Sequence, residues 1–251
     1  MLWSDNLTGL MQVTIEQGSS AEWATAIGTI ALAVMTFLAV LAAVFQDRIR
    51  SWIWRPELDL RILPQPPDCL KIPMTWPTQG GMSQADCYYL RVQVDNMGHQ
   101  AAKKVELFLG EILEKTPSGF ARRQTFLPLN LLWANFREPT MFLDHLSPHV
   151  PKHCDVAHII DPAARTSIPG EDNPALGLSS QQTALSLDLV VKPNTFSYLL
   201  PPGTYRLKLV LGAANAQPVT RWVEIVHSGQ WFSNEQQMLS TGLQIRLLDH
   251  A

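Results

Sequence analysis

The chain has 251 residues, a formal net charge of -3 at pH 7 and a charged fraction of only 16%. A near-neutral chain without a basic cluster has no electrostatic footprint for nucleic acid, so we expect no nucleic-acid partner. The three cysteines, Cys69, Cys87 and Cys154, form no Cys-x-x-Cys motif. Their odd number argues against a disulfide framework and against a cysteine zinc site, and scattered thiols suit a reducing compartment.

The first clear element is an uncharged stretch of 23 residues, Trp23 to Phe45. A helix of this length would measure roughly 34 Å, enough to cross a hydrocarbon core of about 30 Å. A signal peptide has a basic start and an apolar run of about 7–15 residues, whereas here no Lys or Arg precedes a longer run. A buried core helix is the other alternative. We predict a transmembrane helix over residues 21–46, after an extracytoplasmic tail over residues 1–20 that is either an interfacial helix or disordered.

Arginines follow this stretch and none precedes it, in a basic juxtamembrane linker over residues 47–56. Because Lys and Arg are enriched on the cytoplasmic side, we expect the tail outside and the large domain in the cytoplasm. Tryptophan rings favour the headgroup level, although packing of Trp52 and Trp54 against the domain is the alternative. The expected membrane-interface residues are Trp23, Arg48, Arg50, Trp52, Trp54 and Arg55.

Two pairs of small residues lie four positions apart within the stretch, Ala24 with Gly28 and Ala39 with Ala43. Small residues at this spacing let helix backbones approach closely in lipid. They predict self-association into a homo-oligomer, and the alternative is that they simply face lipid.

After Pro56 the pattern changes to strict alternation, first in Glu57–Leu63, which predicts a strand. Residues 64–81 contain five prolines and end in Gly-Gly, so we expect a loop there, and a second long loop over residues 161–182. Residues 231–239 are expected to form one or two helical turns. Further strands are expected at residues 87–95, 104–113, 125–133, 150–160, 184–191, 200–211, 219–226 and 242–248.

Eight or nine short strands separated by turns indicate a mainly β domain, an antiparallel β-sandwich over residues 57–251. We do not expect a parallel α/β sheet, because no strand alternates with a helical pattern of about 10–15 residues.

Residues 89–109, YLRVQVDNMGHQAAKKVELFL, resemble the strand–turn–strand hairpin of bacterial Ig-like domains of the CARDB type, in which Asn-x-Gly, Ala and Val-x-Val recur. The resemblance implies an Ig-like sandwich and a bacterial origin, and it brings no catalytic residues. The order of helix, basic flank and domain is similar to that of uncharacterised bacterial single-pass membrane proteins, which implies the inner membrane.

The best chemical candidates are four histidines close in sequence. They are His145, His149, His153 and His158, with Cys154 and Asp155 beside them. Zinc needs three or four ligands that converge at about 2.0–2.3 Å. A helix would align the histidines spaced by four, but Pro148 and Pro151 forbid that helix. We therefore expect loop histidines and neither a metal nor a cofactor, with a metal site as the alternative.

No nucleophile elbow, phosphate-binding glycine loop or His-Glu-x-x-His motif occurs, so we expect no enzyme. The acidic pair Glu171-Asp172 lies in the second long loop and is expected at the surface. The aromatic residues are expected in the core, and any that remain exposed with Tyr88 or Tyr89 would mark an interaction patch. They are Trp76, Trp133, Trp222, Trp231 and Phe232.

The function expected from these features is a membrane-anchored, non-enzymatic binding or sensing protein. Its cytoplasmic sandwich would bind a protein or small ligand at the lipid bilayer. The alternative is a bacterial defence effector that oligomerises through its transmembrane helix and disrupts the membrane.

Overall fold

The computed structural model describes residues 20–136 and 138–248, and for residues 47–53 it describes the backbone only. The expected tail over residues 1–20 lies outside the described residues except for Ser20. The chain divides into two compact units, Met1–Ile53 and Trp54–Ala251.

The first unit contains one helix, α1 (Ser20–Ile53). Its part from Ser20 to Gln46 is apolar and long enough to span a membrane, and no residue of its most apolar window is buried. Thr25, Thr29 and Thr36 each donate the side-chain hydroxyl to the carbonyl four residues earlier, at 2.8–2.9 Å. The only polar side chains of the interior of this stretch are thereby satisfied within the helix itself, as a hydrocarbon environment requires.

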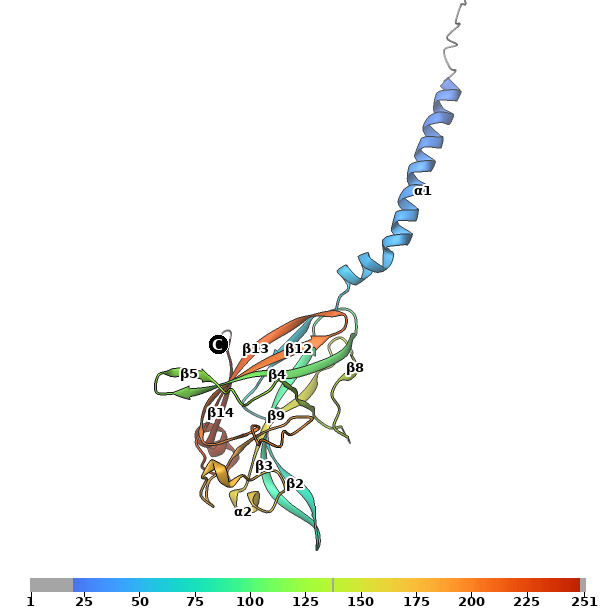
Figure 1. Cartoon of the computed structure of the whole chain (residues 1–251). Coiled ribbons are helices and arrows are strands. Elements are labelled where there is room, and N and C mark those ends of the chain that lie inside the picture. The colour runs from blue at the N-terminus through green and yellow to red at the C-terminus, as the bar shows by residue number, and fades with distance from the viewer. Residues whose placement is uncertain (1–19, 137, 249–251) are drawn as a thin grey trace, which may run out of the picture. The chain divides into compact units, whose positions relative to one another are not determined.

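The second unit is a sandwich of two antiparallel sheets of seven strands each, which confirms the predicted fold class (Figure 1). One sheet has the order β1-β3-β9-β10-β11, with β2 also on β3 and β7 on β9. Its strands are β1 (Leu58–Arg61), β2 (Cys69–Thr78), β3 (Gly81–Asn96), β7 (Leu132–Trp133), β9 (Lys152–Ile160), β10 (Leu185–Leu187) and β11 (Leu199–Leu200).

The other sheet has the order β14-β13-β12-β4-β5, with β6 and β8 also on β4. Its strands are β4 (Ala102–Thr116), β5 (Gly119–Arg122), β6 (Leu129–Asn130), β8 (Leu143–Leu146), β12 (Gly203–Ala213), β13 (Ala216–His227) and β14 (Leu243–Leu248). Short helical segments, α2 (Pro162–Arg165), η1 (Pro174–Leu176), α3 (Glu235–Gln237) and η2 (Met238–Gly242), lie between strands.

The core lies between the sheets and follows the alternation seen in the sequence. Along β12, every second side chain from Tyr205 to Leu211 is fully buried. On β4 the buried positions change from odd to even numbers between Leu109 and Ile112. The register with β12 shifts at the same place, so a bulge at Gly110 keeps both ends of the strand facing the core.

The prediction of a continuous loop over residues 64–81 is wrong, because β2 pairs with β3 over its whole length. Proline is tolerated in β2 because this is an edge strand. The Lys71 N–H points away from β3 and donates to Glu235 Oε1 at 3.1 Å. Pro73 and Pro77 lie two and six positions after Lys71, so their backbone nitrogens face the same free edge. Because proline has no N–H, this edge offers few hydrogen-bond donors to another chain.

Residues 125–133 also differ from the single strand expected there. They form β6, which pairs with β4, and β7, which pairs with β9 in the opposite sheet. The chain therefore crosses between the sheets at the fully buried Leu131.

Candidate functional site

The four candidate histidines lie in different surroundings. His145 and His149 are exposed, His153 is half-buried and lies 3.1 Å from Asp68 (Nε2 to Oδ1), and His158 is buried on β9. Within residues 20–136 and 138–248, no group of three or more His, Cys, Asp or Glu side chains is arranged to hold a metal ion. The structure therefore does not bring the histidine-rich segment together as a ligand set. The prediction of loop histidines is wrong for His145 on β8 and for His153 and His158 on β9.

Instead, His158 takes part in a buried ionic cluster with Glu171, Asp188 and Lys192, here called the His158 centre. The Nδ1 atom of His158 lies 2.7 Å from Asp188 Oδ1, and its Nε2 atom lies 3.2 Å from Glu171 Oε2. Lys192 Nζ donates to the other oxygen of Glu171 at 2.5 Å. The prediction that Glu171 lies at the surface is wrong, since this residue is only 6% exposed.

The charges of the His158 centre depend on one another. Burial by itself would lower the pKa of His158, but the carboxylates of Asp188 and Glu171 outweigh it and raise the pKa to about 10. Burial would raise the pKa of Glu171, but His158 and Lys192 lower it to about 2. The imidazole is therefore a cation at neutral pH, with both ring nitrogens committed to carboxylates. A histidine in this state has no free nitrogen for a metal or for a transferred proton.

This centre fixes the long segment between β9 and β10 to the sheet. Tyr198 donates its hydroxyl to the carbonyl of Gly170 at 2.8 Å, beside Glu171. Arg165 bonds to the carboxylate of Asp172 and to the carbonyl of Ser179. A segment rich in proline, glycine and serine is thus held by ionic and hydrogen bonds, in addition to the buried side chain of Ile168.

A second feature is the contact between the first residues of the domain, Arg55–Glu57, and the turn Asn96–Gly98, here called the N-terminal clamp. The side-chain oxygen of Asn96 accepts from the N–H groups of Glu57 and Gly98, both at 3.1 Å. The Met97 N–H donates to the Glu57 carbonyl at 2.6 Å. A Cβ atom on Gly98 would lie 2.4 Å from the Arg55 carbonyl oxygen and 2.6 Å from the Glu57 nitrogen. Only glycine permits this close approach.

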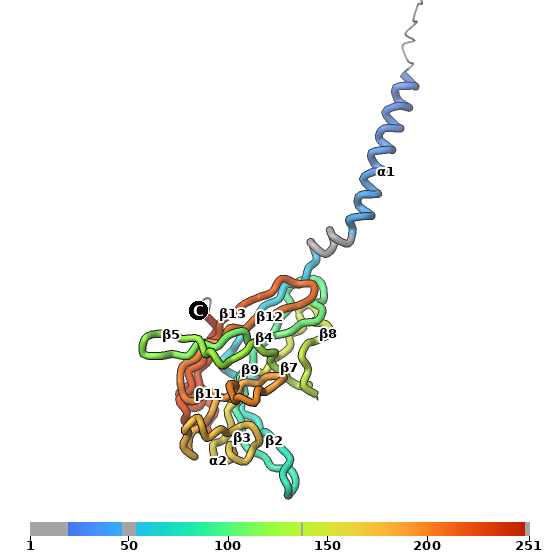
Figure 2. Tube along the Cα trace, viewed as in Figure 1, coloured from blue at the N-terminus to red at the C-terminus, as the bar shows by residue number. Residues whose placement is uncertain are grey.

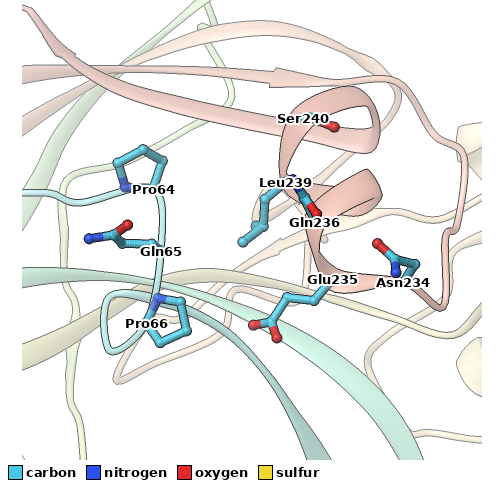
Figure 3. A pocket seen from close by; sticks show the side chains of 8 residues that line it. All are labelled: Pro64, Gln65, Pro66, Asn234, Glu235, Gln236, Leu239 and Ser240. Atoms are coloured by element: carbon cyan, nitrogen blue, oxygen red, sulfur yellow. The ribbon is translucent and has the colours of Figure 1, made fainter.

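The third feature is a cleft of about 610 Å³ between the loop after β1 and the helical turns before β14 (Figure 3). Leu239 and Glu235 point across it toward the loop (Figure 3). Its lining combines proline and leucine with amide, hydroxyl and carboxylate groups: Pro64, Gln65, Pro66, Asn234, Glu235, Gln236, Leu239 and Ser240.

The residues predicted at the membrane are only partly described. Trp23 and Trp54 are 66% and 51% exposed, and Arg55 is exposed. The side chains of Arg48, Arg50 and Trp52 lie outside the described residues. On a helix of 3.6 residues per turn the four small residues fall within an arc of about 100°. Those residues, Ala24, Gly28, Ala39 and Ala43, are all exposed.

Most of the aromatic residues contribute to packing, as expected. Trp76 and Trp133 are buried. Trp231 is half-buried and packs against the buried Tyr88, with ring centroids 5.0 Å apart. They form no exposed patch with Tyr88.

Comparison with protein-family models, with curated proteins and with solved structures gave no significant match. The likeness of residues 89–109 to CARDB-type domains therefore stays a prediction. The Asn-x-Gly turn in that stretch has a clear structural role here, because it forms half of the N-terminal clamp.

We expect the contribution of the His158 centre to folding stability to fall as the pH rises into the alkaline range. The pKa of His158 is raised on folding from about 6.5 in an unfolded chain, so its contribution is complete below that value and is lost as the pH rises through about 10. Chemical denaturation of the full chain in detergent should show His158→Gln less stable at neutral pH by about 3–5 kcal/mol, because the substitution leaves buried carboxylates unpaired.

The difference from the wild-type chain should shrink as the pH approaches 10. The exposed His145→Gln variant is the matched control and should follow the wild-type curve. A His158→Gln deficit that is constant with pH would contradict a charged histidine in the folded state.

We expect Gly98→Ala to open the N-terminal clamp, because the backbone of Arg55–Glu57 has to move away from the new methyl group. Inserting a methyl group into a tightly packed site costs about 1–3 kcal/mol. Hydrogen exchange should show faster exchange at the Met97 amide, which donates to Glu57. Gly80→Ala is the control, since its Cβ meets nothing within 4 Å. Equal protection in both variants would show that the clamp does not hold Arg55–Glu57.

Proposed function

We propose that this protein is a single-pass, membrane-anchored binding protein whose β-sandwich holds a protein or small ligand at the bilayer. The observation that carries the proposal is the helix Ser20–Gln46, which is long and apolar enough to span a membrane and has no buried residue in its most apolar window. An uncovered apolar surface of this size is unfavourable in water and favourable in hydrocarbon.

We further propose a location in the bacterial inner membrane with the sandwich in the cytoplasm. This orientation is supported by the arginines at positions 48, 50 and 55, which follow the apolar stretch, while no Lys or Arg precedes it. The three free cysteines are all buried in the sandwich, which suits a compartment where thiols stay reduced.

A binding role without catalysis is supported by the state of the reactive groups. Burial, with a smaller effect of the Asp68 charge, raises the pKa of the Cys69 thiol to about 12. Burial also raises the pKa values of Cys87 and Cys154 well above the usual range, so none of the three is a ready nucleophile. The imidazole of His158 is held between carboxylates and is closed to solvent.

The cleft of Figure 3 is the binding site that we propose. A concave surface with apolar walls and a few convergent polar groups is the usual form of a ligand site. The exposed amide of Gln236 and the second oxygen of Glu235, whose Oε1 accepts from the Lys71 N–H, match the donors and acceptors of a peptide backbone. Leu239 and the prolines provide apolar contact.

A defence effector that oligomerises through its helix is the second candidate. The observation that favours it is the common face of Ala24, Gly28, Ala39 and Ala43 on α1.

Expression of the full chain in a bacterial host tests the anchor. We expect the protein in the membrane fraction after high-salt extraction, with a reporter fused behind Ala251 active in the cytoplasm. The double variant Leu32→Arg/Leu38→Arg should move to the soluble fraction or be degraded, because an arginine at the centre of a span costs about 2.5–3.5 kcal/mol.

The matched control is Leu63→Arg/Leu127→Arg, which changes two leucines exposed on the sandwich and should leave the protein in the membrane. Wild-type protein in the soluble fraction, or a reporter active only in the periplasm, would overturn the proposal. Normal growth and membrane potential during expression agree with the first candidate function and count against the second.

A photo-crosslinking residue tests the cleft. Placed at position 239, it should form a defined adduct in cells, and Gln236→Arg in the same cleft should abolish that adduct by filling the site. Placed at Met82, which is 70% exposed on the β2–β3 hairpin, it is the control and should give none. The same adducts from both positions would argue against a specific site in the cleft.

A further inference from the structure

We propose that one end of the sandwich, here called the clamp end, lies against anionic lipid headgroups and contacts them through Arg55, Lys103 and Met97. The proposal rests on the proposed function, since it requires α1 to span a bilayer. The sequence predicts membrane contact only for the helix and its flanking residues. This proposal adds a surface of the folded domain.

The clamp end consists of four segments bonded to one another: residues 55–57, 96–103, 147–150 and 213–216. The Asn96 carbonyl accepts from the His149 N–H at 2.9 Å. The side chain of Asn215 accepts from the Lys103 N–H at 2.8 Å and donates to the Ala101 carbonyl at 3.0 Å. These bonds join the β3–β4 and β12–β13 turns, and the tip of the β2–β3 hairpin lies at the opposite end of the sandwich (Figure 2).

The chain itself requires the clamp end to stay close to the lipid. The apolar part of α1 ends at Gln46 and the helix ends at Ile53, so about 10 Å of helix separates the two positions. A headgroup layer is about 5–8 Å thick on each side. Arg55 follows two residues later and is already fixed in the N-terminal clamp, so no spacer separates the membrane from this surface.

The exposed residues of the clamp end suit an anionic headgroup layer. Met97 is 42% exposed and Val150 is 49% exposed, so apolar side chains are available at the tips of the turns. Arg55 and Lys103 are exposed, and no ion pair engages either side chain among the described residues. Each basic group near an anionic membrane surface favours the bound state about fivefold.

The neighbouring charges do not cancel these cations. Lys104 is paired with Asp144 at 2.5 Å, so both charges are already used. Asp95 is 5% exposed and lies beneath the surface. Glu57 is the one exposed acidic side chain within the four segments, against two unpaired cations. The charge balance and the short connection favour lipid over a protein partner on this surface.

Fluorescence quenching in nanodiscs tests the proposal with the full chain. Because the native cysteines are buried, a dye can be attached selectively at His99→Cys, in the clamp end, or at Gln79→Cys, at the opposite tip. The discs contain either phosphatidylcholine alone or phosphatidylcholine with phosphatidylglycerol, and a small fraction of lipid carries a nitroxide on its headgroup. We expect quenching at position 99 several times that at position 79, and stronger quenching in the anionic discs.

Lys103→Glu should lower quenching at position 99 in anionic discs toward the value in neutral discs. It changes the charge by two units, and each unit shifts the ratio of bound to unbound domain about fivefold. Lys115→Glu, on an exposed lysine of β4, is the matched control and should have no effect. Protein that inserts into discs but shows equal quenching at both positions would overturn this inference and leave the anchor intact. The inference would also be overturned if quenching at position 99 were the same in neutral and anionic discs and unchanged by Lys103→Glu. A dye at position 99 that a bound protein shields from the lipid would overturn it as well. Failure to insert into discs would overturn the proposed function itself.

Discussion

The most apolar window of α1 has no buried residue, and the proposed membrane anchor depends on this exposed apolar surface. A soluble protein covers such a stripe with its own core. Here the sandwich already has a complete core between its sheets, made by strands such as β4, β9 and β12. The three threonine hydroxyls of the helix are bonded to its own backbone, which fits the hydrocarbon environment that we propose for it.

Inside the sandwich, a buried ionic cluster helps to fix a long segment in place, as apolar side chains do for the strands. The segment between β9 and β10 has few residues that could be buried as a stripe, yet it is attached through Glu171 to a fully buried histidine. A buried ion pair is often no more stabilising than an apolar pair of the same shape, but removal of one partner is costly. The His158 centre therefore selects one placement of this segment more than it adds stability, and it closes the imidazole to other chemistry.

The sequence predicts what is local and periodic. Alternation predicted most of the long strands and the sandwich, because one face of each strand is buried along its length. It missed β2, since Pro73 and Pro77 mimic a loop until the free edge of the strand is known. It also missed the His158 centre, because His158, Glu171 and Asp188 are separated by 13 and 30 positions and no local pattern links them. The Asn96–Gly98 turn was predicted, but its contact with Arg55–Glu57 spans about forty positions and is visible only in the fold.

The N-terminal clamp and the proposed cleft are connected by a single short strand. From Glu57 the chain passes through the four residues of β1, about 13 Å in a strand, and reaches Pro64 and Gln65 at the cleft soon afterwards. The backbone there is fixed as well, since the Leu63 N–H donates to the buried Asp68 at 2.7 Å. A ligand in the cleft and a lipid contact at the clamp end would thus act on the two ends of one rigid segment. Under the proposed function, a flexible linker would let the domain explore a large volume around its anchor. The short connection would instead keep the cleft near the bilayer and would raise the effective concentration of a ligand that is itself held in the membrane.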